Sequence, residues 1–145
     1  MEKGDARQFL HTASSEPVSR NIVELESHRH LYNKVNELIN IAVNSSISTH
    51  EMRQLLHLNS NSFGSRFATQ LVRALQREDE DEREAVVWLL IVLDDPQTIP
   101  QLQHLALNQN LTRATRLAAS LALAGMGATR EMAATSQRIR LYAIG

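Results

Sequence analysis

The chain has no cysteine among its 145 residues. This excludes a disulfide framework and thiolate chemistry, and it fits a reducing compartment. Aromatic residues make up only 4% of the chain, which also has just five glycines and three prolines. So few aromatic and turn-forming residues disfavour a fold of many strands. Because the apolar residues are mostly Leu, Ala, Ile and Val, we expect an all-α protein.

A strong net charge is also missing. Fifteen Lys and Arg residues balance sixteen Asp and Glu residues, which leaves a formal net charge of -1. This balance creates no overall field that would attract nucleic acid, so the composition argues against a nucleic-acid partner. No run approaches the ~20 apolar residues of a membrane span, and the first residues lack the apolar core of a signal peptide. We therefore expect a cytoplasmic protein without a membrane partner.

Signatures of catalysis and of cofactor binding are absent from the sequence. It has no Gly-rich phosphate loop, no nucleophile elbow and no His-Glu-x-x-His motif. Of the six histidines, His28 and His30 would lie on different faces of a helix, and His50 and His57 would lie two turns apart. We expect surface histidines, no metal site, no cofactor and no enzymatic activity.

What the sequence does contain is helical periodicity, clearest after residue 95. A turn at Asp95–Pro96 precedes a helix that should run to about Asn108, with Thr98 as its expected cap. A second helix follows over residues 111–124, and it is apolar on two sides. The glycines at positions 125 and 127 are expected to stop this helix.

The same plan occurs about 33 residues earlier in the chain. An amphipathic helix over residues 66–77 leads into an acidic turn, Glu78–Glu82, whose carboxylates favour a helix N-terminus. The helix that follows is apolar nearly all round, and its segment 83–90 aligns with 116–123. We expect this helix to be the central buried one, sharing an apolar seam with the later hairpin through Trp88 and Leu117.

The segments Asp95-Pro96-x-x-Ile99-Pro100-x-Leu102 and Thr115-Arg116-x-Ala118-Ala119-x-x-Ala122-Leu123-x-Gly125 resemble HEAT-like repeats of the phycobilin-lyase type. The resemblance covers roughly residues 64–127. It implies a short α-solenoid of stacked antiparallel helix pairs, with about six or seven helices in all. It further implies that Arg83 and Arg116 pair with acids in the preceding turns. Asp79 or Asp81 can supply the first acid, whereas the second turn offers only asparagines.

The N-terminal part of the chain is less regular. We expect a flexible arm over residues 1–14 and one helical-repeat domain over residues 15–145. The N-terminal helices should occupy residues 15–58, with a start at Ser15–Pro17 and a break near Ser27–His30. A buried stripe is predicted from apolar residues at helical spacing, namely Leu31, Val35, Leu38, Ile39 and Ala42.

Three further features complete the prediction. Ser48 and Glu51 form a capping box, in which each residue bonds the backbone of the other. Residues 59–65 have the most loop-like composition in the chain and should separate the N-terminal helices from the repeats. Residues 128–145 are expected to form a C-terminal cap over the last apolar face, or to serve a neighbouring subunit.

The best candidates for partner binding are five arginines. They would line one side of the repeats, if neighbouring acids do not neutralise them, and they are Arg66, Arg73, Arg77, Arg113 and Arg116. Charge reversal at Arg73 and Arg113 should then abolish partner binding without lowering thermal stability. Pairing with the acidic turn is the structural alternative.

The predicted function is a protein-interaction or scaffold module that presents a helical surface to a protein or peptide. The resemblance implies one alternative, an accessory or lyase-type protein for tetrapyrrole-bearing partners. A second alternative is a nucleic-acid-binding HEAT-like protein, which would need an electropositive concave face. Self-association through the helix of residues 111–124 would make the protein a homodimer.

Overall fold

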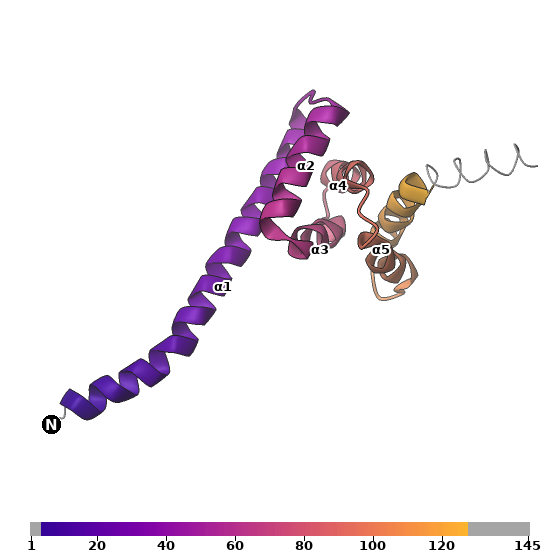
Figure 1. The fold of residues 1–145 in the computed structure, drawn as a ribbon. Helices are drawn as coiled ribbons and strands as arrows, with labels where there is room; N and C mark the ends of the chain where they lie inside the picture. The colour runs from indigo at the N-terminus through magenta and orange to yellow at the C-terminus, as the bar shows by residue number, and fades with distance from the viewer. Residues whose placement is uncertain (1–3, 128–145) are drawn as a thin grey trace, which may run out of the picture. The chain divides into compact units, whose positions relative to one another are not determined.

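The computed structural model describes the backbone of residues 4–127 and the side chains of residues 22–127. Within these residues it is all helical, which confirms the predicted class. The helices are α1 (Gly4–Asn44), α2 (Thr49–Phe63), α3 (Ser65–Arg73), the short 3-10 helix η1 (Ala74–Gln76), α4 (Glu80–Leu93) and α5 (Thr98–Leu107) (Figure 1). One more helix covers residues 113–127. The predicted cap at 128–145 lies outside the described residues. No described helix combines the length and apolarity needed to cross a membrane.

The chain divides into two compact units, Met1–Lys34 and Val35–Gly145. In the first unit α1 begins at Gly4, so the helix start predicted at Ser15–Pro17 is wrong. The predicted break near Ser27–His30 is also wrong, because this stretch has no glycine or proline and α1 continues through it. The predicted mobility of residues 1–14 stays a prediction.

In the second unit, the structure at the end of α1 and at the start of α2 agrees with the predictions made from the sequence. Val35, Leu38 and Ile39 are buried, as the stripe predicts. The capping box is confirmed: the Glu51 amide donates to the Ser48 hydroxyl at 3.1 Å, and the Ser48 amide donates to the Glu51 carboxylate at 3.4 Å. Two backbone donors at the start of α2 are thereby satisfied.

The predicted loop over residues 59–65 is reduced to one residue. α2 runs through Phe63, and the Asn59 side chain donates to the Leu55 carbonyl one turn earlier. Gly64 alone makes the turn, with a φ of 69° that residues other than glycine rarely adopt. The polar residues before it are therefore helical, and α2 joins α3 without a linker.

The core of the second unit lies where α2 meets α3 and α4, and where α3 also meets α5. The largest side chains that are fully buried there come from these helices, from the end of α1 and from η1, and include Phe67, Ile39, Met52, Leu56, Leu71, Leu75, Leu89, Leu90 and Leu102. Each such side chain contributes about 1.5–3 kcal/mol by leaving water. This core holds α4 in place and fixes which of its sides faces outward.

The helix over residues 113–127 packs against α4 at a glycine. A Cβ built on Gly125 would lie 2.2 Å from the Ile91 Cδ1 atom, so a larger residue at this position would require the Ile91 side chain to move. The helix continues to residue 127, and the prediction that Gly125 and Gly127 stop it is wrong. The glycine at 125 serves helix packing instead of helix termination.

Thr98 is likewise not a helix cap. Its side chain is fully buried, donates to the Asp95 carbonyl at 2.7 Å and lies 3.8 Å from the Met126 sulfur. Thr98 thus connects the start of α5 with the turn before it and with the helix over residues 113–127.

Candidate interaction surface

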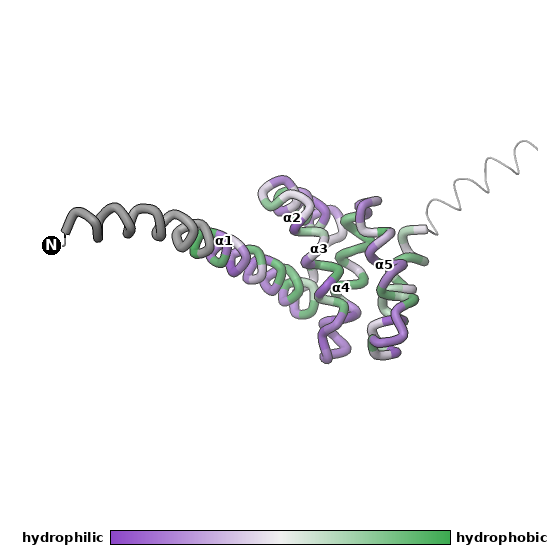
Figure 2. Tube along the Cα trace, turned by 90° about the horizontal axis from the view of Figure 1, so that it is seen from below, coloured by the Kyte–Doolittle hydropathy of each residue, from purple (hydrophilic) through white to green (hydrophobic). Residues whose placement is uncertain are grey.

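The two sides of α4 differ sharply in character. Val86, Leu89 and Leu90 are fully buried, whereas Asp81 and Glu84 are exposed and Trp88 is half-buried. Figure 2 shows the helix changing from a hydrophilic start to a hydrophobic second half. Because residues three, four and seven apart share one side of a helix, the outward side carries two carboxylates followed by an indole.

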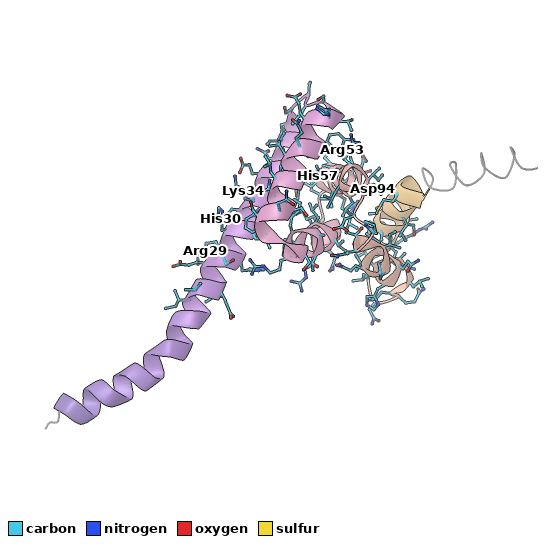
Figure 3. The ribbon with its side chains drawn as sticks, in the orientation of Figure 1. Arg29, His30, Lys34, Arg53, His57 and Asp94 are labelled. Carbon is cyan, nitrogen blue, oxygen red and sulfur yellow. The ribbon has the colours of Figure 1, made fainter. Side chains whose placement is uncertain are left out.

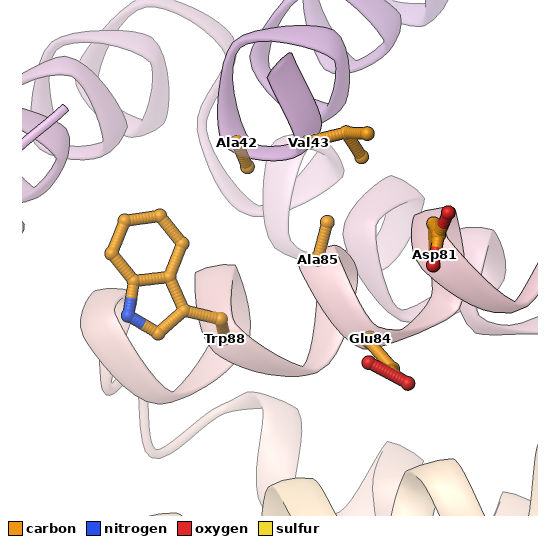
Figure 4. A pocket seen from close by; sticks show the side chains of 6 residues that line it. All are labelled: Ala42, Val43, Asp81, Glu84, Ala85 and Trp88. Atoms are coloured by element: carbon orange, nitrogen blue, oxygen red, sulfur yellow. The ribbon is translucent and has the colours of Figure 1, made fainter. Parts of the chain in front are cut away.

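A hollow lies between this outward side and the end of α1. We call it the Trp88 hollow; Ala42, Val43, Asp81, Glu84, Ala85 and Trp88 line it (Figure 4). Its volume is about 420 Å³. One end is aromatic, the middle is made of small apolar side chains, and carboxylates stand at the other end. A positively charged group with an apolar stem has the complementary character.

On the other side of α4 lies a second hollow, which we call the leucine groove. It is lined by Glu80, Arg83, Glu84, Val87, Ala114, Leu117, Ala118 and Leu121. Leu117 is 51% exposed and Leu121 is 61% exposed, although both are large apolar residues. Glu84 belongs to both hollows, so the two adjoin across one ridge of α4.

These exposures correct the predicted seam between the hairpins. Leu117 lies at the surface and Trp88 is only half-buried, so neither belongs to a shared core. The helix over residues 113–127 is rotated by about one position from the prediction, and its buried side chains are Thr115, Ala118, Ala119, Ala122 and Met126. The buried side of this helix is thus mostly alanine, and Leu117 and Leu121 point outward.

The helices that carry the two hollows begin in the same way. The Asp79 carboxylate accepts the Glu82 amide at 3.0 Å, and the Thr112 hydroxyl accepts the Thr115 amide at 3.2 Å. Such caps satisfy amides that have no partner within the helix. α4 and the helix over residues 113–127 are therefore capped in an equivalent way at their N-termini.

The arginine after each cap reaches back to the preceding turn. Arg83 donates to the carbonyls of Arg77 and Glu78, at 3.0 and 2.8 Å, and Arg116 donates to the side chain of Gln109 at 3.2 Å. The resemblance implied partners among turn aspartates, but these hydrogen bonds go to carbonyl oxygens. Sequence reasoning therefore placed both arginines correctly. Arg83 does not use the aspartates that were named for it, and Arg116, for which the turn offered only asparagines, uses Gln109.

The five arginine candidates are spread over α3, the turn before α4 and the helix over residues 113–127. Arg66 and Arg73 are exposed on α3, and Arg113 is exposed at the start of the last described helix. Arg77 forms an ion pair with Glu82 at 3.3 Å and also donates to Asn36. Arg77 and Arg116 thus have structural partners, while the role of the set in binding stays a prediction.

The described histidines lie at the surface, at positions 28, 30, 50, 57 and 104. His57 projects from α2 one turn after Arg53, and Asp94 lies at the end of α4 (Figure 3). The backbone of Asp94 has a left-handed conformation. His50 contacts the Gln54 amide at 3.3 Å. Among the described residues no three His, Asp or Glu side chains converge as a metal site would require.

Sequence reasoning missed both hollows because it assigned Trp88 and Leu117 to the core. One signal was present: Asp81, Glu84 and Trp88 follow the spacing of a single helix side, and an indole on a charged side is rarely fully buried. Comparison with known proteins adds no assignment, since no family model, no curated protein and no solved structure matches this chain significantly.

Proposed function

We propose that this chain is a non-enzymatic interaction module whose scaffold is a short α-solenoid of HEAT-like helix pairs. Two features support the solenoid: α3 contacts α5, and α4 meets the helix over residues 113–127 at Gly125. Equivalent helices of successive pairs thus adjoin, as in a stacked repeat. The equivalent caps at Asp79 and Thr112 add a local repeat to this arrangement.

The observation that carries the proposal is the leucine groove. Two large apolar side chains one turn apart, both more than half exposed, gain free energy when a partner covers them. Acidic side chains from α4 border the groove. The complementary partner is an amphipathic helix of a protein, with apolar residues for the groove and basic residues for its border. The same acids oppose a nucleic-acid ligand at this surface.

Affinity capture tests this function. The tagged chain is the bait in a lysate of its own source, and captured proteins are quantified by mass spectrometry. The double variant Leu117→Glu/Leu121→Glu should lose a specific partner by about tenfold or more, because charge replaces the apolar contact. Leu58→Glu is the matched control, since Leu58 is 63% exposed on α2, outside the groove.

Capture of the same proteins in equal amounts by all three baits contradicts the proposal. Light scattering of the purified chain tests whether a second copy of the chain occupies the groove. If it does, the particle mass falls to that of the monomer in the double variant and not in Leu58→Glu.

A further inference from the structure

We infer that the Trp88 hollow binds an arginine side chain presented by the protein partner, an inference that rests on the proposed interaction function. The indole is half-buried and lines an open hollow. Glu84 lies one turn before Trp88 on α4, and Asp81 lies nearly one turn further (Figure 4). Because residues four apart share one side of a helix, Glu84 is the carboxylate next to Trp88 on the outward side of α4.

The two carboxylates are available for such a ligand. Among the described residues, neither the Asp81 side chain nor the Glu84 side chain forms a hydrogen bond or an ion pair. The nearby arginines are engaged elsewhere, because Arg77 pairs with Glu82 and Arg83 donates to backbone carbonyls. The two carboxylates that line the Trp88 hollow are therefore exposed and receive no cation from these neighbours.

Helix capping does not account for Glu84. Acids favour a helix N-terminus only within its first turn, where Glu80, Asp81 and Glu82 already lie behind the Asp79 cap. Glu84 follows that turn and lines both hollows. Its place on the ridge between them suits contact with a partner that crosses α4.

Arginine fits the hollow better than lysine does. A planar guanidinium stacks on an aromatic face and presents paired donors to carboxylates, whereas an ammonium is a compact and strongly hydrated charge. The methylene stem of arginine can lie against Ala42, Val43 and Ala85, which form the apolar middle of the hollow. A partner segment that lies in the leucine groove and crosses α4 at Glu84 would place its arginine in the Trp88 hollow.

The chain has one tryptophan, so its fluorescence and its indole N–H resonance report on this hollow alone. The probe is N-acetyl-arginine N-methylamide, titrated at constant ionic strength against the full chain. The indole signal should shift saturably. The citrulline counterpart, which is neutral with a similar shape, should bind at least about fivefold more weakly, and the lysine counterpart should also bind more weakly.

The variant Asp81→Asn/Glu84→Gln should weaken arginine binding by about fivefold or more, while Glu78→Gln, which removes an acid outside the hollow, should leave it unchanged. Circular dichroism verifies that each variant is folded. Equal binding of arginine and citrulline or of arginine and lysine, an unaffected double variant, or no saturable shift overturns the inference. Because the probe does not touch the leucine groove, Leu117→Glu/Leu121→Glu should respond like the wild type. Failure of partner capture and failure of arginine binding are therefore separate results.

Discussion

Two segments that are 33 residues apart in the sequence, α4 with α3 before it and residues 113–127 with α5 before them, share their buried positions and differ in their outward ones; each segment is called a hairpin below, as in the proposed solenoid. Ala85 and Ala118 occupy equivalent positions and are both buried, as are Val86 and Ala119. At the outward positions, Glu84 and Trp88 of the first hairpin correspond to Leu117 and Leu121 of the second. The scaffold thus tolerates different outward side chains, and these define two hollows of different chemistry.

The buried side chains of the two hairpins also differ in size. Val86 and Leu89 of α4 correspond to the smaller Ala119 and Ala122 of the later helix, and all four are buried. α4 is also contacted by α2 and α3. Because stability follows the apolar area removed from water, the first hairpin should dominate the stability of the second unit.

The largest effect is expected at Leu89, which is fully buried. Leu89→Ala should lower the free energy of unfolding by about 2–5 kcal/mol, since it removes apolar contact and leaves a cavity. Leu121→Ala, the same change at a residue that is 61% exposed, should cost less than about 1 kcal/mol. Denaturant titration measures both, and equal losses would contradict the assigned burial of the two hairpins.

The next effect concerns the contact between the hairpins. Gly125→Ala should destabilise by about 1–3 kcal/mol, because the added methyl group meets Ile91. Gly127→Ala is the control: a Cβ there has no neighbour within 4 Å, and alanine favours the helix by up to about 1 kcal/mol.

A double-mutant cycle with Ile91→Ala sharpens this test. Removing the isoleucine branch makes room for the methyl group, so Gly125→Ala should cost less in that background. Additive losses in thermal or denaturant unfolding would show that the helices do not meet at this point.

The two caps should differ by a smaller amount. Asp79→Ala and Thr112→Ala should each destabilise by about 0.5–2 kcal/mol. The loss at Asp79 should be the larger, because a carboxylate also interacts with the helix dipole. Thermal unfolding at low and high salt checks this, and only the extra loss at Asp79 should shrink with salt. A salt-independent difference would assign it to another cause.

The smallest effect on stability is expected from making the first hairpin resemble the second. Glu84→Leu changes an exposed position, so the free energy of unfolding should stay within about 0.5 kcal/mol. Its arginine response, read from Trp88, should nevertheless weaken. Unfolding by denaturant and the probe titration measure the two quantities, and a large stability loss would show that Glu84 is structural.

Local chemistry made part of this structure predictable. The capping box at Ser48 depends only on residues three apart. The all-helical class follows from periodicity and composition. Each of these features depends on neighbours in sequence.

Features that depend on tertiary packing were not predictable in the same way. The helix over residues 113–127 is apolar on two sides, so its pattern alone could not decide that Ala118 faces inward and Leu117 outward. The role of Gly125 depends on Ile91, which belongs to a different helix and is distant in the sequence. The polar residues before Gly64 have weak helix propensity, and tertiary contacts of α2 outweigh it.

The most direct test of the account is the dissociation constant of a captured partner, measured by titration calorimetry for two double variants. If binding occurs at the outward side of α4 and residues 113–127, Leu117→Glu/Leu121→Glu should weaken it by about tenfold or more. Arg73 and Arg113 line neither hollow. Arg73→Glu/Arg113→Glu should therefore leave the dissociation constant within about twofold, in contrast to the loss of binding expected from the sequence alone. The opposite ranking, with the leucine variant unaffected and the arginine variant defective, would contradict the account.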